Sequence, residues 1–392
     1  MAPSSSTHAP HSSGDRSRLR GLGCWLVVAL GWIALFEGAS WMFFHAVKAD
    51  FIFYDLADFT VTPENIRKQD TWFDAELGWR ERFATRFGER PSRLAEGAPV
   101  MAVFGDSFIY GGEVSDEETV AEHLAKAFGR PVLNFGGGGY GMDQALLRFE
   151  RSLAGTRAPV ALFEFISENI NRNLNVYRKF YNPKTGIPMT KPRFVVENGQ
   201  LRLVANPIRT AEERNRLSDT AALRDIGRLD AWYNRQDLPV LGFPYSGIFF
   251  TGSFWRQLGL ILAHRPPGDL NAAPWVDMWQ NPQAVELSFL ILDRFHAGAR
   301  RQGAIPLIVP FPQRGEVDDY KRSHAVPLSI VKTRAECEKR GWSCLFPLLE
   351  AETIFSGDTG TYFAPHGHFS ALGERAMARW LFDKIDGRFV SR

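Results

Sequence analysis

The longest apolar run of the chain lies near its N-terminus, at about 21–47. A run of this length is sufficient for one helix that crosses a bilayer. It exceeds the ~7 to 15 apolar residues of a signal peptide, and no small-residue cleavage site follows it. A buried core helix is the alternative, but the arginines before the run and the tryptophans along it favour a membrane. The pattern therefore predicts a transmembrane helix at 21–47.

The residues before this run predict its orientation. Residues 1–20 are rich in Ser, His and Pro, which predicts a disordered tail, and they end with Arg16, Arg18 and Arg20. The positive-inside rule places such a basic flank in the cytoplasm. We therefore expect a single-pass protein of the cytoplasmic (inner) membrane, with everything after about residue 48 on the periplasmic side.

Glu37 is an acidic residue inside the apolar run. An isolated charge near the middle of a membrane span costs about 2.5 to 3.5 kcal/mol on insertion scales. We therefore expect Glu37 to be protonated or paired with a partner helix.

From residue 98 the pattern changes to short apolar runs that alternate with amphipathic helices. The runs at 99–104, 131–135 and 160–166 predict buried strands of a parallel sheet. Helical segments separate them, and this order of strands and helices is typical of a doubly wound α/β fold.

The same alternation returns near the C-terminus. We expect a helix at 285–300, a strand at 304–309, a helix ending near Arg340, a short strand at Cys344 and a final helix at 371–385. The whole of 98–392 then forms one α/β domain with a doubly wound, flavodoxin-like parallel sheet, and 48–97 connects this domain to the transmembrane helix.

Residues 171–284 interrupt the alternation. The segment 194–204 predicts a hairpin with Asn198 and Gly199 in its turn. The remainder mixes a polar helical stretch with loops rich in Pro, Gly and aromatic residues. We interpret the insertion as a hairpin and helical cap over the active edge of the sheet, with a purely structural embellishment as the alternative.

Composition excludes several classes of protein. Hydrophobic residues make up 45% of the chain, charged residues 23%, and the net charge is +2, without a basic block that would bind nucleic acid. Cys337 and Cys344 are spaced so that they form either a disulfide or two free thiols. Neither their spacing nor the pair His366 and His368 matches a metal site, and no cofactor is expected.

Ser107 is the first candidate for chemistry, because it directly follows the first predicted strand of the sheet. Ligands bind doubly wound sheets at the carboxyl ends of the strands. A serine in that place becomes a nucleophile when a base takes its proton and when donors hold the oxyanion that forms after attack.

The Gly-Asp-Ser-Phe motif at 105–108 resembles the first block of the SGNH/GDSL hydrolase family, and the later blocks follow in the family's order. Gly139, in a glycine run after the second strand, matches the glycine whose N–H binds the oxyanion. Asn169, after the third strand, matches the asparagine whose side-chain amide is a further donor. His368, before the last helix, matches the base. The chain therefore resembles a membrane-anchored bacterial member of this family.

The resemblance covers about 98–170 and 286–386, and it fails at the acid of the triad. No aspartate precedes His368 by two or three residues, and Ile170 replaces the usual aspartate after Asn169. A backbone carbonyl, a carboxylate from elsewhere in the chain, or a Ser-His dyad without an acid are the substitutes. The candidate supporting residues are Asp106, His366, Asp358 and Glu168.

The resemblance implies a serine esterase, of acyl-ester or deacetylase type, that works through an acyl-enzyme on Ser107 with His368 as base. The Ser107 N–H, Gly139 and Asn169 would form its oxyanion hole. The outward topology suits an acylated glycan or a small ester as substrate. An O-acetyltransferase of an exopolysaccharide is one alternative. The other is a catalytically degenerate member that binds a glycan or a protein, because the usual acid is absent.

Overall fold

A computed structural model describes residues 13–48, 50–233, 238–262, 277–386 and 388. The chain forms two compact units. The first, here called the helix unit, comprises Met1–Asp55 and Arg235–Leu270, and the second, the sheet unit, comprises Leu56–Asn234 and Asn271–Arg392. The insertion expected at 171–284 is therefore divided between the two units, and its role as a cap stays a prediction.

The helix unit is built on one long helix, α1 (Ser13–Ala46). Its described part Gly23–Ala46 has a mean hydropathy of 1.7 and is long and apolar enough to cross a membrane. The helix begins at Ser13 rather than at residue 21, so part of the tail expected to be disordered is helical; residues 1–12 lie outside the described part of the chain. The 3-10 helix η4 (Tyr245–Phe250) and helix α9 (Gly252–Leu262) complete this unit.

The sheet unit contains a parallel sheet of four strands, β3 (Met101–Phe104), β4 (Val132–Asn134), β5 (Val160–Phe165) and β8 (Ile305–Pro310). Their order in the sheet is β4-β3-β5-β8. Cys344 extends it through a parallel bridge to Ile308. Numbered along the chain this order is 2-1-3-4, which is the order of flavodoxin-like sheets. The expectation of an α/β fold with a parallel sheet is confirmed.

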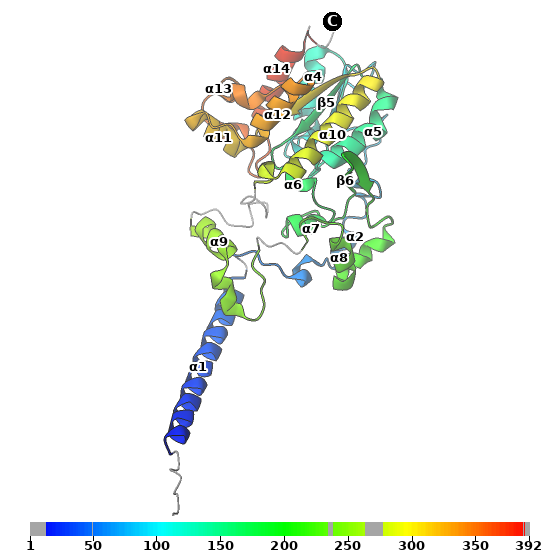
Figure 1. Cartoon of the computed structure of the whole chain (residues 1–392). Coiled ribbons are helices and arrows are strands. Elements are labelled where there is room, and N and C mark those ends of the chain that lie inside the picture. The colour runs from blue at the N-terminus through cyan, green and yellow to red at the C-terminus, as the bar shows by residue number, and fades with distance from the viewer. Residues whose placement is uncertain (1–12, 49, 234–237, 263–276, 387, 389–392) are drawn as a thin grey trace, which may run out of the picture. The chain divides into compact units, whose positions relative to one another are not determined.

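Helices cover both faces of this sheet (Figure 1). On one face, Met101 and Val103 of β3 pack in a core with helices α4 (Val120–Phe128), α12 (Leu328–Arg340) and α14 (Ala371–Ile385). On the other face, Ala102 and Phe104 pack against α5 (Met142–Thr156) and α10 (Pro282–Arg301). Because β3 is buried on both faces, it reads as a continuous apolar run in the sequence.

The predicted hairpin is present as strands β6 (Arg193–Glu197) and β7 (Gln200–Val204). Its turn residues Asn198 and Gly199 have φ values of 52° and 71°. Positive φ at both central positions is the geometry that Asn-Gly favours.

The segment expected as a connector at 48–97 carries short elements of its own. These are η1 (Leu56–Phe59), α2 (Pro63–Arg67), β1 (Phe73–Asp74) and β2 (Gly78–Trp79). The remaining elements are α3 (Ser107–Tyr110), η2 (Asp116–Glu118), α6 (Asn169–Arg172), α7 (Arg178–Tyr181), η3 (Glu212–Ser218), α8 (Thr220–Gly227), η5 (Met278–Gln280), α11 (Arg314–Ser323), η6 (Pro347–Glu350), α13 (Ala351–Ile354) and η7 (Thr359–Tyr362).

The two alternatives for Cys337 and Cys344 are resolved by a disulfide between them. Cys337 lies in the last turns of α12, and Cys344 lies at the edge of the sheet. The bond therefore ties a covering helix to the sheet beneath it. Cys24 is a free, exposed thiol.

Candidate active site

Ser107 is the first residue of the short helix α3, and Gly105 and Asp106 separate it from the end of β3. The turn between them depends on Gly105, because a Cβ there would lie 2.2 Å from Oε2 of Glu164. Only glycine allows the chain to pass this close to β5. The serine is therefore presented at the carboxyl end of a central strand, at a helix start where N–H groups point outward.

Asp106 holds this turn in place from a buried position, with 1% of its surface exposed. Its Oδ1 accepts a hydrogen bond of 2.8 Å from the N–H of Phe108 and so caps α3. Its Oδ2 accepts from Nδ2 of Asn169 at 2.9 Å and from the guanidinium of Arg172 at 3.2 Å. Its own N–H donates to Glu164 at 2.9 Å. Asp106 therefore orients the serine without touching the hydroxyl.

His368 is brought to Ser107 by the loop before α14. Its Nε2 lies 2.8 Å from Oγ of Ser107. Its Nδ1 lies 2.9 Å from Oε2 of Glu113. A carboxylate, an imidazole and a serine hydroxyl therefore form one continuous chain of contacts, in the arrangement that activates serine nucleophiles.

Glu113 is the acid that the sequence-based reasoning missed. Its carboxylate also accepts hydrogen bonds from the backbone N–H groups of His366, at 3.0 Å, and His368, at 3.1 Å. Partial burial opposes its charged form, but these donors and the His368 side chain together hold the pKa of Glu113 below its ordinary value. The group is therefore ionised at neutral pH, which fixes the Nδ1–H tautomer of His368 and stabilises the imidazolium.

The loop that carries Glu113 is shaped by two glycines. Gly111 ends α3 with a φ of 84°, and the N–H of Gly112 donates to the Ser107 carbonyl at 3.0 Å. A Cβ at Gly112 would lie 3.5 Å from the ring of His368. The chain thus turns back directly after the nucleophile helix and places Glu113 beside the base.

The carboxylates named from the sequence do not contact His368. Asp358 is exposed and caps η7 by accepting from the N–H of Gly360 at 2.9 Å. Glu168 forms an ion pair with Arg172 at 2.9 Å and accepts from Tyr181. Each of these two is held by partners of its own in this structure, and the carboxylate from elsewhere in the chain that contacts His368 is Glu113. His366 contributes its backbone N–H to Glu113.

Gly139 lies in the loop after β4, which runs beside the nucleophile turn. The N–H of Gly137 donates to the Gly105 carbonyl at 3.1 Å. The Gly138 carbonyl accepts a hydrogen bond from Trp79 Nε1 at 2.8 Å. The Gly139 carbonyl accepts one from the Arg178 guanidinium at 2.7 Å. In the described part of the chain, neither the Gly139 N–H nor the Ser107 N–H makes a hydrogen bond. Both N–H groups are therefore unpaired among the described residues, as oxyanion donors must be before substrate binds.

Arg178 closes this loop from a buried position, with 7% of its surface exposed. Its Nε also donates to Thr185 at 3.0 Å. Burial and the neighbouring Arg172 lower the pKa of Arg178 to about 10, so it remains charged at neutral pH. A positive charge therefore lies directly against Gly139.

Asn169 is placed differently from what the family resemblance implies. It is 1% exposed, and its Nδ2 donates to Asp106 at 2.9 Å and lies 3.4 Å from the Tyr140 carbonyl. Its Oδ1 accepts from the N–H of Ile166 at 3.2 Å. The amide therefore holds the nucleophile turn in this structure, and its role as an oxyanion donor stays a prediction.

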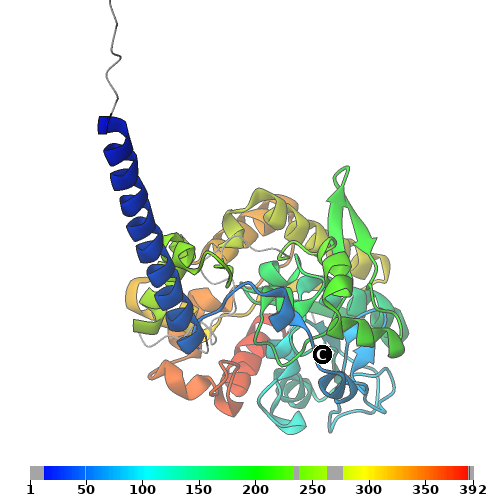
Figure 2. The same cartoon turned by 90° about the horizontal axis from the view of Figure 1, so that it is seen from below.

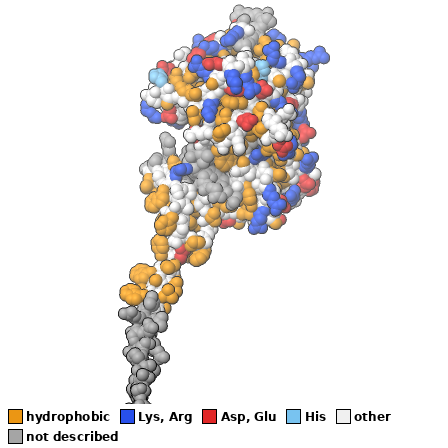
Figure 3. Space-filling model, in the orientation of Figure 1, with side chains coloured by type: hydrophobic (Ala, Val, Ile, Leu, Met, Phe, Trp, Pro, Cys, Tyr) orange, Lys and Arg blue, Asp and Glu red, His pale blue; other side chains and the backbone are white. Residues whose placement is uncertain are grey.

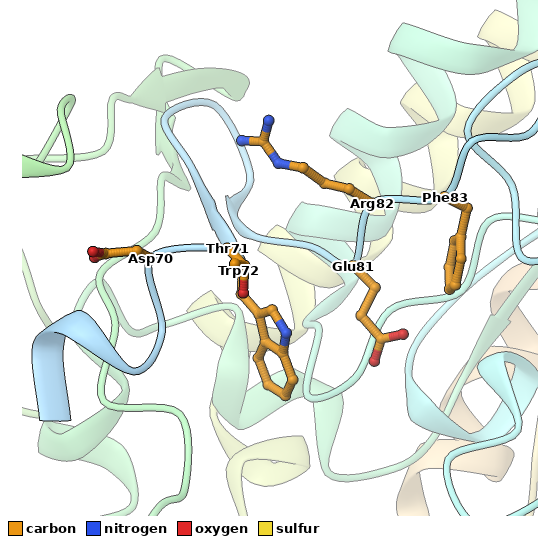
Figure 4. Close-up of a pocket in the computed structure, with 6 residues that line it drawn as sticks. All are labelled: Asp70, Thr71, Trp72, Glu81, Arg82 and Phe83. Atoms are coloured by element: carbon orange, nitrogen blue, oxygen red, sulfur yellow. The ribbon is translucent and has the colours of Figure 1, made fainter.

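A surface pocket with a volume of about 740 Å³ lies in the connector next to α3. It is lined by Asp70, Thr71, Trp72, Glu81, Arg82 and Phe83. Figure 4 shows the indole of Trp72 and the carboxylate of Glu81 on the same side of the chain, while Arg82 points away. Tyr110, the last residue of α3, donates its hydroxyl proton to Glu81. One hydrogen bond therefore connects the pocket wall to the nucleophile helix.

Within the described ranges, no group of three or more His, Cys, Asp or Glu side chains is arranged to hold a metal ion. No protein-family model matches the chain, and no curated protein matches it. The site is therefore interpreted from its own geometry.

Proposed function

We propose that the chain is a serine esterase of the SGNH/GDSL type. The observation that carries the proposal is the pair of contacts from Ser107 Oγ to His368 Nε2, at 2.8 Å, and from His368 Nδ1 to Glu113, at 2.9 Å. The parallel sheet, with the serine at the end of β3 and the histidine before α14, supports it further.

In the proposed reaction, Ser107 Oγ attacks the carbonyl carbon of an ester while its proton passes to Nε2 of His368. Glu113 stays ionised and stabilises the imidazolium. The tetrahedral intermediate collapses, the C–O bond to the alcohol breaks, and His368 returns the proton to the leaving alcohol. Water then attacks the acyl-serine with the same histidine as base, which releases the acid and restores Ser107.

The oxyanion would be held by the N–H groups of Ser107 and Gly139, which have no acceptor of their own among the described residues. The charge of Arg178 against Gly139 adds a favourable field. Asn169 is proposed as a third donor on the family resemblance alone, and it would have to leave Asp106 to serve.

The proposed substrate is an acylated glycan or a small ester outside the cytoplasmic membrane, with α1 as the anchor. The half-exposed indole of Trp72 beside polar groups would suit a sugar ring, which also keeps an O-acetyltransferase as the second candidate. In that case a sugar hydroxyl replaces water in the second step. The degenerate, binding-only alternative rested on the absent aspartate and on Ile170. The contact of Glu113 with His368 supports the catalytic proposal over it.

The test uses the full chain in detergent micelles with p-nitrophenyl acetate and an acetylated sugar as substrates. We expect Ser107→Ala and His368→Ala each to lower kcat by about 10⁴ to 10⁶-fold, as losses of nucleophile and base do. Ser323→Ala, an exposed serine at the end of α11, is the matched control and should retain full activity. Residual turnover of Ser107→Ala equal to that of the control would refute the mechanism, and so would a folded wild type that cleaves neither substrate.

A further inference from the structure

The segment 238–262 of the helix unit is unusually apolar and exposes large side chains. It contains a single charged residue, Arg256. Phe243 is 80% exposed, Phe250 83%, Trp255 59% and Leu262 70%. Such a group of exposed large apolar residues indicates a surface that meets a partner other than water.

Glu37 attaches this segment to α1 through hydrogen bonds. Its carboxylate accepts hydrogen bonds from the N–H of Tyr245 at 2.7 Å and from the N–H of Ser246 at 3.2 Å, and a further one from the Ser246 hydroxyl. These donors stand at the N-terminus of η4. Glu37 therefore has partners within its own unit, and a separate partner helix stays a prediction.

A small aromatic core adds to this attachment. Phe44 of α1 is fully buried against Phe53, Phe249 and Phe254, with a centroid distance of 4.7 Å to Phe249. The buried side chain of Gln257 bonds both the N–H and the carbonyl of Ile52. Figures 1 and 2 both show η4 and α9 beside the C-terminal part of α1.

Several polar groups of the segment form hydrogen bonds within it, which suits a lipid environment. The N–H of Gly247 donates to Pro244, and that of Thr251 donates to Ile248. The indole N–H of Trp255 donates to the Phe249 carbonyl at 2.8 Å. Arg256 is exposed and long enough to extend its charge toward lipid headgroups.

The position of Glu37 along α1 sets the depth of the segment. The apolar span Gly23–Ala46 has 24 residues, or about 36 Å of helix. Glu37 lies nine residues before its end, roughly 13 Å. If the span is centred on a hydrocarbon layer of about 30 Å, η4 lies roughly 10 Å inside that layer. Figure 3 shows the hydrophobic surface of the described part of α1 continuing over this segment.

We propose that the segment 238–262 contains a second membrane-embedded element, η4 with the residues just before it, which inserts beside α1 into the leaflet at its C-terminal end, with Phe243 and Phe250 in contact with lipid acyl chains. The proposal rests on α1 spanning a bilayer and is independent of the esterase chemistry. The partner is lipid because the exposed surface continues that of α1 at a depth set by Glu37.

The test places an environment-sensitive fluorophore on single cysteines of the full chain in lipid nanodiscs. The background is Cys24→Ser, because Cys24 is the free thiol while Cys337 and Cys344 are joined. The probe sites are Phe250→Cys in the segment, Trp32→Cys on α1 and Ser323→Cys in the sheet unit. Quenching by lipids with spin labels on their acyl chains is compared with quenching by aqueous iodide.

We expect the Phe250→Cys probe to lose fluorescence with the spin-labelled lipids, as the Trp32→Cys probe does, and to resist iodide. The Ser323→Cys probe should show the reverse. Iodide quenching at position 250 equal to that at 323 would overturn the proposal. Protection from both quenchers would also overturn it, since a protein partner or a second copy would then cover the surface.

The role of Glu37 is tested separately with Glu37→Leu, which removes all of these hydrogen bonds but keeps α1 apolar. We expect iodide quenching of the Phe250→Cys probe to rise, while the Trp32→Cys probe remains in lipid. An unchanged probe at 250 would show that the aromatic core alone holds the segment, which would overturn the attachment assigned to Glu37.

Discussion

Glu113 in the sheet unit and Glu37 in the helix unit both accept hydrogen bonds from backbone N–H groups, but their roles differ. Glu113 accepts the backbone N–H groups of His366 and His368 in the sheet unit. Glu37 accepts those of Tyr245 and Ser246 in the helix unit. The difference lies in the next contact, which is an imidazole for Glu113 and a serine hydroxyl for Glu37.

The comparison shows that backbone donors fix a carboxylate without deciding its role. At Glu113 these N–H groups and the His368 side chain favour the ionised form and lower the pKa of the carboxyl group, although partial burial opposes this. At Glu113 the fixed charge faces a base that is itself 2.8 Å from a hydroxyl, so a proton can be transferred. At Glu37 no titratable base is in contact among the described residues, so the carboxyl group only joins two pieces of chain.

The largest expected effect separates the two glutamates directly. Glu113→Gln keeps the volume but removes the charge and the tautomer control, so we expect kcat/KM to fall by about 10³ to 10⁴-fold, as losing a triad acid does. Glu37→Gln, the matched change in the other unit, should leave kcat/KM as in the wild type. Ester hydrolysis by both full-length variants measures this. Equal activities of the two variants would contradict the assignment of Glu113 to catalysis and Glu37 to structure.

A smaller effect is expected from changing Gly139, whose N–H binds no carboxylate among the described residues and is proposed to bind the oxyanion. Gly139 has a φ of 71°, and a Cβ there would lie 3.1 Å from the Arg178 guanidinium. Gly139→Ala should therefore strain the loop, turn its N–H away and lower kcat by about 10²-fold, as losing one oxyanion donor does. Gly138→Ala is the control, because a Cβ at Gly138 meets nothing within 4 Å. Equal losses of activity in both variants, at matching melting temperatures, would contradict the role of the Gly139 N–H as an oxyanion donor.

The smallest effect concerns Glu164, a third carboxylate, which is fully buried behind Asp106. Burial and the charge of Asp106 raise the pKa of Glu164 well above its ordinary value of 4.5. The folded protein then keeps a proton that the unfolded chain releases, so stability is lost as the pH rises from 4.5 toward the folded pKa, by at most ~1.4 kcal/mol per pH unit.

Glu164→Gln mimics the protonated form and cannot ionise. We therefore expect its melting temperature to exceed that of the wild type by a margin that grows between pH 5 and pH 9. Differential scanning calorimetry of both proteins across this range measures the margin. Parallel curves would mean that Glu164 does not change protonation on unfolding.

Much of the sheet unit was predictable because its strands are short apolar runs that are buried on both faces. Ser107 was predicted from its place after the first of these runs, and His368 from its resemblance to the family's last block. Glu113 was not predicted, because the family pattern places the acid just before the catalytic histidine and Glu113 lies more than 250 residues before it in the sequence. The available signal was local: a diglycine at 111–112, directly after the nucleophile helix, followed by a carboxylate.

The insertion and Glu37 were harder to predict for a different reason. Their partners are far apart in sequence, since Glu37 contacts Tyr245 and Ser246 across more than 200 residues. No periodicity within either segment encodes that pairing. Asn169 likewise matched a motif, but the motif could not indicate that its amide binds Asp106. Local patterns predicted elements, while side-chain partners across the fold required the structure.

The most direct test of the central claim is the site of covalent labelling by a fluorophosphonate, read by peptide mass spectrometry on the full chain. An activated serine forms one adduct, and the account predicts that adduct on Ser107. Labelling should slow strongly in His368→Ala and Glu113→Gln, and it should proceed at the wild-type rate in Asp358→Asn. A folded wild type that remains unlabelled at Ser107, or labels equally fast in Glu113→Gln, would contradict the proposed Ser107, His368 and Glu113 triad.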